Sequence, residues 1–454
     1  MATAFERYFT SLQNKDVVVL GLGVSNRQLV RLLLEFGCRV TGCDRTERSQ
    51  LDDEVLELER SGCRLQLGEH YLDDLQADVV FRTPGMHPDI PALAKLREQG
   101  AMITSEMEVF FEVCPCRILA VTGSDGKTTT TTLISEMLKA EGKTVWLGGN
   151  IGTPLLCMTP KMKETDFAVV ELSSFQLIDM RRSPEIAVIT NVAPNHLDVH
   201  KDMDEYVEAK KNIFKFQAQG NRLVLNADNA TTNGFSGAAT TRKFSRQQET
   251  IGAWVRDGMI YRDGAPVLNV SDILIPGVHN IENYMAAILA VEGLVCDDTI
   301  RHVAKTFGGV EHRIELVRVR DGVRYYNDSI ASSPSRTIAG LRSFSQKVIL
   351  IAGGYDKNIP YDDLGPEICR SVKLLLVNGA TGQKIRVAVE NTPGYVPGAP
   401  EIIDCDVLDE AICQAVARAE SGDVVLLSPA SAAFDQFKNF AVRGNYFKKR
   451  IMEL

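Results

Sequence analysis

The chain has 454 residues, 44% of them hydrophobic and 24% charged, and its formal net charge at pH 7 is −9. This composition is typical of folded globular proteins and excludes a disordered chain, while the negative charge argues against a general nucleic-acid binder. Because the ten cysteines form no CxxC pair and no signal segment or membrane-length apolar run is present, we predict a cytoplasmic protein without a membrane or nucleic-acid partner.

The first block of the chain, residues 1–112, is predicted to be a Rossmann-like α/β domain. Asp16–Leu20 is expected to form an apolar strand, Gly21–Gly23 a tight turn, and Ser25–Phe36 a helix with apolar residues at helical spacing. This order of strand, glycine turn and helix is typical of a nucleotide-binding βαβ unit.

The nucleotide fingerprint of this block is only partial. The strand Arg39–Cys43 ends at Asp44, where dinucleotide-binding folds place an acid on a ribose, but Asn26 replaces the third glycine of GxGxxG. The pattern favours a domain that binds some phosphate-bearing nucleotide, and a plain βαβ turn without a ligand stays open as the alternative. A second strand-end loop, Thr83–Gly85, is expected on the same side of the sheet.

The second block, residues 113–309, opens with the most informative motif of the chain. The strand Ile118–Thr122 runs into Gly123–Thr129, whose sequence is GSDGKTT. Small residues let backbone N–H groups close around phosphate oxygens, Lys127 can reach the outer phosphates, and the Thr128 hydroxyl can hold Mg²⁺. The first glycine of the full GxxxxGK[ST] signature is absent, so a turn that only links strand to helix remains the alternative.

Strands and helices alternate through the rest of the chain, which predicts mainly parallel sheets. Hairpin signals between Ile251 and Ile275 predict a small antiparallel flap, and a helix follows from about Ile281. Strands in the third block, residues 310–454, end in small-residue or Ser-Pro loops and predict a second Rossmann-like domain. The expected strands of both blocks are Phe167–Val170, Ile186–Asn191, Arg222–Asn226, Val348–Ile351, Leu374–Val377 and Val424–Leu427.

Three polar residues of the second block suggest metal chemistry. Glu171 follows an apolar strand, where a carboxylate can bind Mg²⁺ directly or through water. His196 also follows a strand, and it is either a metal ligand, a positioning group or a satisfied structural histidine. Lys210 lies in the apolar stripe of the predicted helix Met203–Phe214, so it either snorkels or is desolvated. A desolvated, neutral amine can capture CO₂ as a carbamate that binds a metal.

Nine motifs, in order along nearly the whole chain, resemble those of the Mur ligase family. They are GSDGKTT (Gly123–Thr129), GGNIGTP (Gly148–Pro154), ELSSFQL (Glu171–Leu177), TNVAPNHLD (Thr190–Asp198), YVEAK (Tyr206–Lys210), HNIEN (His279–Asn283), HRIE (His312–Glu315), NDS (Asn327–Ser329) and SPASAAFDQFKNF (Ser428–Phe440). The resemblance implies an α/β fold of three domains. These are a Rossmann-like N-terminal domain, a central P-loop ATPase-like domain with a parallel sheet and a small antiparallel flap, and a Rossmann-like C-terminal domain.

The resemblance also implies an ATP-dependent amide ligase of cytoplasmic peptidoglycan-precursor synthesis, expected to be a monomer. The string ELSSFQL favours the branch of the family that joins D-glutamate to UDP-N-acetylmuramoyl-L-alanine through an acyl phosphate. Two Mg²⁺ ions, replaceable by Mn²⁺, are expected with ATP, together with a carbamate on Lys210. A sibling ligase that takes L-alanine or a diamino acid is the alternative within the family.

By the same resemblance, each expected ligand has its own set of residues. ATP would contact Gly123, Ser124, Asp125, Gly126, Lys127, Thr128, Thr129, Asn280, Asn283, Arg313 and Asp328. The UDP substrate would contact Val24, Ser25, Asp44, Arg45, Thr83, Gly85, Asn150, Ser173 and His196, and D-glutamate would contact Lys357 and Phe440. The catalytic groups would be Lys127, Glu171, His196 and Lys210; Thr128 and Glu171 would hold one Mg²⁺, and His196 with carbamylated Lys210 the second.

Two departures from the family pattern bear on D-glutamate recognition. Family members commonly read NDSKATN where this chain has Asn327–Ser333, so Ile330 removes a basic contact. Ala433 stands where a glutamate-contacting serine is often found, and Ser332 or Ser431 could compensate. Neither departure touches the phosphate chemistry.

Two classes of protein outside the family are less favoured. A nicotinamide-dependent dehydrogenase would use the first domain, but Asn26 breaks its fingerprint and the better nucleotide site lies downstream. A P-loop switch or partner-binding protein would need neither Lys210 in an apolar stripe nor a third nucleotide-like domain.

Overall fold

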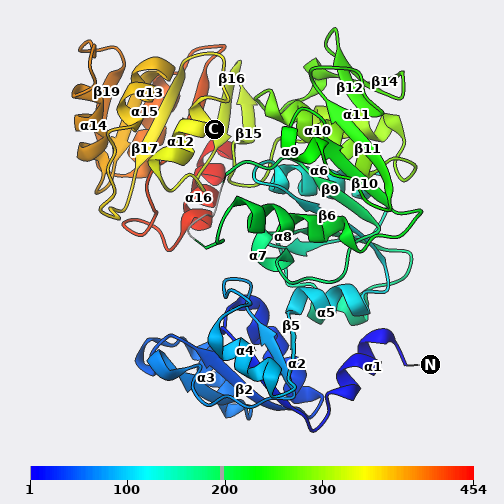
Figure 1. The fold of residues 1–454 in the computed structure, drawn as a ribbon. Coiled ribbons are helices and arrows are strands. Elements are labelled where there is room, and N and C mark those ends of the chain that lie inside the picture. The colour runs from blue at the N-terminus through cyan, green and yellow to red at the C-terminus, as the bar shows by residue number, and fades with distance from the viewer. Residues whose placement is uncertain (1, 195–198) are drawn as a thin grey trace. The chain divides into compact units, whose positions relative to one another are not determined.

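The computed structural model describes residues 2–194 and 199–454, which form three β-sheets (Figure 1). The chain divides into two compact units. The first comprises Met1–Leu268 with Glu282–Val303, and the second comprises Asn269–Ile281 with Ala304–Leu454. Among the described residues, no helix is long and apolar enough to cross a membrane.

The first sheet has five parallel strands in the order β3-β2-β1-β4-β5. Its strands are β1 (Asp16–Leu20), β2 (Arg39–Asp44), β3 (Arg64–Leu67), β4 (Val79–Arg82) and β5 (Met102–Thr104). The helical segments of this part are α1 (Ala4–Ser11), α2 (Val24–Glu35), η1 (Arg48–Gln50), α3 (Asp53–Arg60), η2 (Gly68–His70), α4 (Pro91–Glu98) and α5 (Glu106–Val113). The order reverses between β1 and β4, and in such doubly wound sheets ligands bind at the carboxyl ends of the strands there.

The second sheet has nine strands in the order β14-β13-β12-β11-β10-β9-β6-β8-β7. They are β6 (Arg117–Thr122), β7 (Val145–Gly149), β8 (Phe167–Glu171), β9 (Ile186–Ile189), β10 (Arg222–Asn226), β11 (Thr240–Ser245), β12 (Gly252–Arg256), β13 (Met259–Arg262) and β14 (Ala265–Asn269). All neighbouring pairs among β6 to β12 are parallel, and β12 pairs antiparallel with β13. The predicted flap is therefore the edge of the main sheet and not a separate layer.

The helices of this central part begin with α6 (Lys127–Ala140), which follows β6 directly. The others are η3 (Leu156–Lys161), α7 (Ser174–Leu177), α8 (Met203–Lys215), α9 (Ala230–Asn233), η4 (Val270–Asp272), α10 (His279–Ala290) and α11 (Asp297–Thr306). The predicted strand at 186–191 ends two residues early, at Ile189. This happens because the side chains of Thr190 and Asn191 turn toward the loop after β6 and hydrogen-bond to it.

The third sheet has six strands in the order β15-β16-β20-β17-β18-β19, with an antiparallel β15–β16 pair at one edge and parallel pairs elsewhere. The strands are β15 (Glu315–Arg320), β16 (Val323–Asn327), β17 (Val348–Gly353), β18 (Val372–Asn378), β19 (Glu401–Cys405) and β20 (Val424–Leu427). The helices are α12 (Pro334–Leu341), α13 (Leu364–Ser371), α14 (Gly382–Glu390), α15 (Leu408–Arg418) and α16 (Phe440–Met452).

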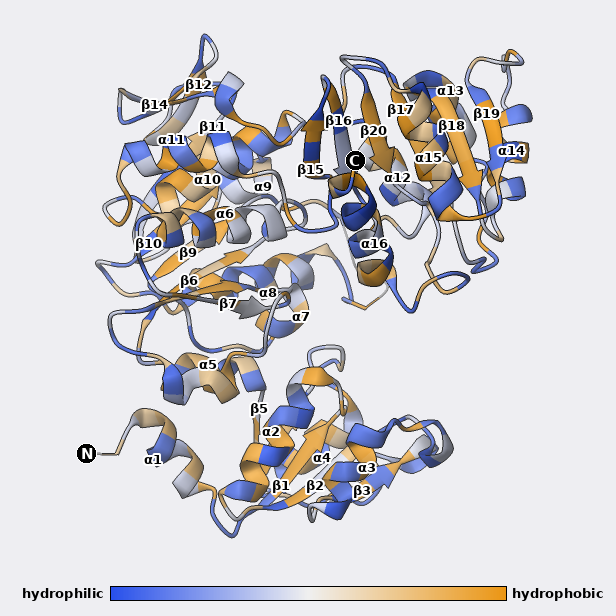
Figure 2. Ribbon diagram, turned by 180° about the vertical axis from the view of Figure 1, so that it is seen from behind, coloured by the Kyte–Doolittle hydropathy of each residue, from blue (hydrophilic) through white to orange (hydrophobic). Residues whose placement is uncertain are grey.

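The central strands of the sheets form the cores. Figure 2 shows strands such as β6, β9, β17 and β18 as hydrophobic, while the helices alternate between hydrophobic and hydrophilic residues. All five residues of β8 are buried, as expected for a parallel sheet covered on both faces. The continuous apolar runs that predicted these strands are the result of that burial. The predicted domain boundaries at 112/113 and 309/310 stay predictions.

Candidate active site

The loop between β6 and α6 is closely packed against its neighbours. Gly126, the N-cap of α6, has a left-handed φ of 77°, and a Cβ at this position would clash with the Asn283 amide. A Cβ at Gly123, where φ is 151°, would clash with the Thr190 hydroxyl. Only glycine combines a positive φ with the absence of a Cβ at these two positions. The glycines of the GSDGKTT motif therefore allow close approach of neighbouring groups as well as the turn.

We call the loop between β6 and α6, residues 123–126, the phosphate loop. The end of β9 holds it in place. The backbone N–H groups of Ser124 and Asp125 donate to the carbonyl and side-chain oxygens of Asn191, at 2.9 and 3.0 Å. The Thr190 hydroxyl donates to the Asp125 carbonyl at 2.5 Å. Because Gly126 has no side chain to cap α6, the first-turn N–H groups and the positive end of the helix dipole suit an anion.

Two lysines donate to the same carbonyl of the phosphate loop. Lys127 Nζ lies 3.0 Å from the Gly123 oxygen and 2.8 Å from the Ser124 oxygen, and Lys210 Nζ lies 2.9 Å from the Gly123 oxygen. Lys210 is only 1% exposed, so it does not snorkel out of the apolar face of α8. Burial, aided by the positive charge of Lys127, lowers the pKa of Lys210 to about 7.

Tyr206 is a site residue to which the YVEAK motif assigned no role. Its hydroxyl lies 2.9 Å from Ser124 Oγ, and its ring centre lies 4.5 Å from Lys210 Nζ. Ser124 Oγ in turn donates to the Ala193 carbonyl at 2.9 Å. The signal in the sequence was a tyrosine one turn before Lys210 on an otherwise apolar helical face. Tyr206 and Lys210 together fix α8 against the phosphate loop.

Glu171 places a carboxylate in the interior of the protein. It ends β8, pairs in register with Val121 of β6, and is 1% exposed. Its Oε1 accepts a hydrogen bond from Asn150 Nδ2 at 2.8 Å, while Oε2 is buried with no hydrogen-bond partner among the described residues. An unpartnered buried carboxylate oxygen is costly unless it binds a cation, so Glu171 fits a Mg²⁺ ligand.

Three other residues of this region, Asn150, Ser173 and His196, were also predicted to belong to the site. Asn150 points its amide at Glu171, so it orients the carboxylate. The Ser173 hydroxyl is engaged with Gln176 in the capping box of α7. His196, predicted as a metal ligand and substrate contact, lies outside the described residues.

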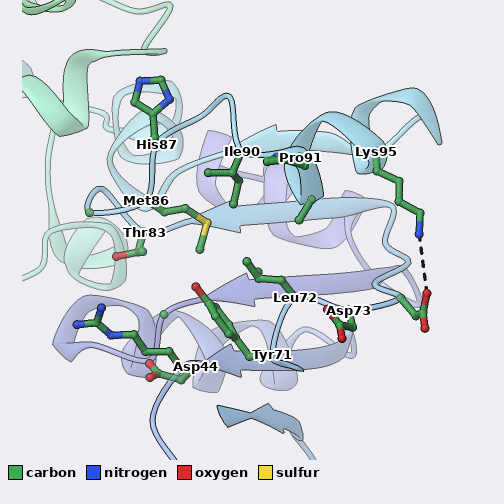
Figure 3. Close-up of a pocket in the computed structure, with 15 residues that line it drawn as sticks. Asp44, Tyr71, Leu72, Asp73, Thr83, Met86, His87, Ile90, Pro91 and Lys95 are labelled. Atoms are coloured by element: carbon green, nitrogen blue, oxygen red, sulfur yellow. Dashed lines mark ion pairs between the residues drawn. The ribbon is translucent and has the colours of Figure 1, made fainter. Parts of the chain in front are cut away.

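The N-terminal part of the first unit contains a cavity of about 1,020 Å³. Four predicted residues line it, namely Asp44, Arg45, Thr83 and Gly85. Figure 3 shows Tyr71, Leu72, Met86 and Ile90 converging on the same space, with Lys95 ion-paired at the far end. These apolar groups were not predicted, because they come from two separate connections of the sheet, one between β3 and β4 and one between β4 and α4. Val24 and Ser25, at the start of α2, are not among the described residues that line this cavity.

The partial dinucleotide fingerprint has a structural reason. Asp44 accepts hydrogen bonds from the backbone N–H groups of Leu22 at 2.7 Å and Thr46 at 2.9 Å. Although partial burial raises its pKa, these bonds lower the pKa below its usual value. Asn26 Nδ2 donates to the carbonyls of Leu20 and Gly21 at 3.2 and 2.8 Å. Both side chains therefore hold the glycine turn together.

In the second unit, the NDS and HRIE motifs meet. The Asn327 amide donates to His312 Nδ1 at 2.9 Å and to Glu315 at 3.1 Å. Asp328 accepts a hydrogen bond from Ser428 Oγ at 2.7 Å and one from the Ile314 N–H at 3.3 Å. Burial raises the pKa of Asp328 to about 7 even though these hydrogen bonds oppose the change.

The residues predicted to contact D-glutamate lie at the surface of the second unit. Lys357 is exposed in the loop after β17, and Phe440 is exposed at the start of α16 with its ring centre 6.0 Å from that of His312. Ser431 is buried, and its hydroxyl hydrogen-bonds to Tyr361 and Thr381. Ser431 is thus committed to the core, which leaves Ser332, half-buried, as the alternative for compensation.

Arg313 and Asn280 are two further residues that were predicted to contact ATP. Arg313 is exposed beside His312. Asn280, in the first turn of α10, is buried and donates to the Pro276 carbonyl at 2.6 Å. Their roles toward ATP stay predictions.

The sequence and the fold can be compared with known proteins. Residues 121–291 match the Mur ligase middle domain, and residues 312–431 match the Mur ligase glutamate ligase domain. The UDP-N-acetylmuramoylalanine–D-glutamate ligase of Acetivibrio thermocellus is 53% identical, covering 99% of this chain and 98% of that protein. The protein of the same name from Clostridium botulinum is 49% identical over the full length of both chains.

Solved structures agree in fold at low identity. The UDP-N-acetylmuramate-alanine ligase of Thermotoga maritima superposes with a TM-score of 0.58 at 18% identity, covering 97% of this chain and all of that one. A UDP-N-acetylmuramoyl-L-alanyl-D-glutamate–2,6-diaminopimelate ligase gives a TM-score of 0.59 at 17% identity, covering 98% of this chain and 94% of that one. These two likenesses confirm the predicted fold class.

The chain belongs to the Mur ligase family, whose members are ATP-dependent enzymes that need Mg²⁺. Within the family, the two full-length relatives with 53% and 49% sequence identity are both named UDP-N-acetylmuramoylalanine–D-glutamate ligase. The predicted family membership is confirmed.

Proposed function

We propose that this chain is an ATP-dependent ligase that joins D-glutamate to UDP-N-acetylmuramoyl-L-alanine through an acyl phosphate. The observation that carries the proposal is the sequence identity of 49–53% to proteins named D-glutamate ligases over essentially the whole chain. The phosphate loop, with Glu171 and Lys210 buried beside it, supplies a place for the reaction of ATP.

Each of three domains has a role in the proposal. We assign residues 1–112 to the uridine nucleotide sugar, 113–309 to ATP, and 310–454 to ATP and D-glutamate. In the N-terminal cavity, the ring of Tyr71 and the apolar side chain of Leu72 suit a flat base. The uncapped N-terminus of α2, at Val24 and Ser25, suits the diphosphate.

The chemistry needs a leaving group, because a carboxylate by itself does not acylate an amine. In the proposed reaction a carboxylate oxygen of the L-alanyl group attacks the γ-phosphorus of ATP and ADP leaves. The amine nitrogen of D-glutamate then attacks the acyl carbon and phosphate leaves. Lys127 serves this reaction by exchanging its two loop carbonyl partners for outer phosphate oxygens, where its charge offsets the negative charge that gathers there.

The metal sites follow from the same residues. Mg²⁺, when bound, draws together the negatively charged carboxylate and phosphate groups and stabilises the charge of the transferred phosphoryl group. We assign Glu171, through its unpartnered Oε2, and Thr128 to one ion. We assign His196 and a carbamate of Lys210 to the other. A lysine whose pKa is lowered to about 7 is largely neutral at slightly alkaline pH, as attack on CO₂ requires.

The setting of the reaction is also part of the proposal. All ten cysteines are free, as is usual for proteins of the reducing cytoplasm, and we place the reaction there. We propose a monomer as the active form, which sedimentation at enzyme concentrations used for turnover would test.

The acyl phosphate gives a direct test. The wild-type protein is incubated with ATP, Mg²⁺ and UDP-N-acetylmuramoyl-L-alanine, without an amino acid, and is then treated with borohydride. An acyl phosphate is reduced to the corresponding alcohol, which we expect in amounts comparable to the enzyme. The Lys127→Ala variant should form none. Absence of the alcohol from the wild-type reaction, with all three ligands shown to bind, would contradict the acyl-phosphate route.

A further inference from the structure

The loop after β4 is fixed by side chains that the proposed chemistry does not use. Arg82, at the end of β4, is 1% exposed, and its guanidinium pairs with Asp179 at 2.5 Å. The same guanidinium donates to the Met86 carbonyl at 2.5 Å and to the Thr83 carbonyl at 3.1 Å. These contacts determine the course of the loop that lines the N-terminal cavity.

His87, the residue after Met86, makes a directed contact with the first turn of α8. Its Nε2 lies 3.3 Å from both carboxylate oxygens of Glu205, and its Nδ1 accepts a hydrogen bond from the Asp89 N–H at 3.2 Å. Because Nδ1 accepts, a neutral His87 carries its proton on Nε2 and donates it to Glu205. The two side chains are 18% and 19% exposed, so water competes little for this bond.

Glu205 is the centre of a wider set of hydrogen bonds. Its carboxylate accepts from the Lys201 N–H at 3.0 Å and lies 3.3 Å from His200 Nδ1. Partial burial raises its pKa, but the Lys201 N–H and His87 lower it more strongly, to about 2. The other nitrogen of His200 lies 2.9 Å from Ser174 Oγ. Glu205 therefore stays charged and ties α8 to the loop before it and to the segment that follows Glu171.

The residues that follow Glu205 on α8 reach the phosphate loop. The Tyr206 hydroxyl lies 2.9 Å from Ser124 Oγ, and Lys210 Nζ lies 2.9 Å from the Gly123 oxygen. The start of α8 is thus held on one side by the loop after β4 and on the other by the phosphate loop. A shift of either loop therefore moves the start of α8 or breaks one of these contacts.

His87 also borders the place where the nucleotide sugar is proposed to bind. It lines the cavity of about 1,020 Å³ together with Thr83 and Gly85, and it lines a second cavity of about 520 Å³ together with Glu205. Figure 3 shows its ring above the loop, on the side away from Tyr71. One residue therefore contacts both the substrate cavity and α8.

We propose that His87 and Glu205 are positioning residues that couple filling of the N-terminal cavity by the uridine nucleotide sugar to the placement of Tyr206 and Lys210 at the phosphate loop. This inference rests on the proposed function. Neither residue is assigned to touch reacting atoms; both act through α8. We call the His87–Glu205 contact the α8 bridge.

Steady-state kinetics of single and double variants test the α8 bridge. His87→Leu removes the donor, and a hydrogen bond to a charged group corresponds to about a tenfold change or more in an equilibrium constant. We expect kcat/KM for the nucleotide sugar to fall at least about tenfold, while KM for D-glutamate stays within about twofold. His87→Gln keeps an N–H donor and should restore most of the loss. The double variant with Glu205→Gln should be no worse than the more damaged single variant.

Glu208→Gln is the matched control. Glu208 lies on the same helix, lines the same smaller cavity, is exposed, and pairs with Lys211 at 2.6 Å. This variant should keep the wild-type constants, and melting temperatures of all variants show that each is folded. Unchanged kinetics in His87→Leu, or an equal loss in His87→Gln, overturns the α8 bridge.

Equilibrium binding separates the bridge from the proposed function. Calorimetry gives the affinity of UDP-N-acetylmuramoyl-L-alanine with and without ADP and Mg²⁺. Coupling between two ligands is reciprocal, so each should tighten the other in the wild type and lose this effect in His87→Leu. A wild-type protein that binds both ligands without such coupling contradicts the bridge. A wild-type protein that shows the coupling but does not turn over D-glutamate contradicts the proposed function alone.

Discussion

Replacing Lys210 by methionine tests whether the folded protein holds this lysine as a neutral amine. Burial, aided by Lys127, lowers the pKa of Lys210 from its usual 10.5 to about 7. At roughly 1.36 kcal/mol per pH unit, protonated Lys210 costs the folded state about 5 kcal/mol. Lys210→Met keeps a long apolar side chain and has no charge to bury, so below pH 7 it should be more stable than the wild type.

The sign of the pH dependence follows from where the proton is bound. Between pH 7 and 10.5 the unfolded chain holds a proton on Lys210 that the folded protein has lost, so the stability of the wild type rises with pH. From pH 7 to 8.5 the free energy of unfolding rises by about 2 kcal/mol. For a domain the size of residues 113–309, this corresponds to an increase of about 4–8 °C in melting temperature. The Lys210→Met variant should show no such gain.

The assay is thermal unfolding of both proteins in CO₂-free buffers at half-unit steps of pH. The quantity of interest is the difference between their melting temperatures. Lys211→Met is the matched control, because Lys211 is the next residue on α8 and pairs at the surface with Glu208. A wild-type minus Lys210→Met difference that stays constant from pH 7 to 8.5 would refute the account of a desolvated amine.

Three further changes test other parts of the site. Gly126→Ala places a Cβ in the left-handed region and against Asn283, so it should lower stability by about 1–2 kcal/mol and weaken ATP binding; an unchanged melting temperature contradicts the close packing of the loop. Glu171→Gln should raise the Mg²⁺ concentration for half-maximal activity at least about tenfold with KM for D-glutamate unchanged, and an unaltered Mg²⁺ titration would remove Glu171 as a ligand. For Asp328, whose pKa burial raises from 3.8 to about 7, the folded state binds a proton that the unfolded chain releases, so wild-type stability falls as pH rises from 4 to 7. Asp328→Asn should therefore gain melting temperature relative to the wild type over that window, and parallel melting curves at pH 4 and 7 would argue against a buried acid there.

The phosphate loop and its strand could be predicted because their signals are local. β6 is a continuous apolar run, and Gly123 and Gly126 mark positions where the backbone conformation and the close neighbours exclude a Cβ. Lys210 could also be singled out, since its place on the apolar face of a helix is visible in the spacing of residues. Whether it snorkels or is buried depended on packing between α8 and the phosphate loop, which spacing does not contain.

The contents of the N-terminal cavity could not be predicted in the same way. Tyr71 comes from the connection between β3 and β4, whereas Met86 and Ile90 come from the loop between β4 and α4, and the two groups meet only in the folded protein. Asp44, which was expected to contact a ligand, lines this cavity, and its carboxylate also accepts hydrogen bonds from the N–H groups of Leu22 and Thr46. An acid at a strand end predicted the ligand contact, whereas its hydrogen bonds to the backbone are visible only in the folded protein.

Amino-acid selectivity tests the central claim most directly. Purified protein is given ATP, Mg²⁺ and UDP-N-acetylmuramoyl-L-alanine, and the release of ADP and the formation of the new amide are measured with D-glutamate, L-glutamate, L-alanine and a diamino acid in turn. We predict stoichiometric ADP and amide with D-glutamate and little of either with the others. Amide formation with L-alanine or a diamino acid, or none with D-glutamate, would contradict the account.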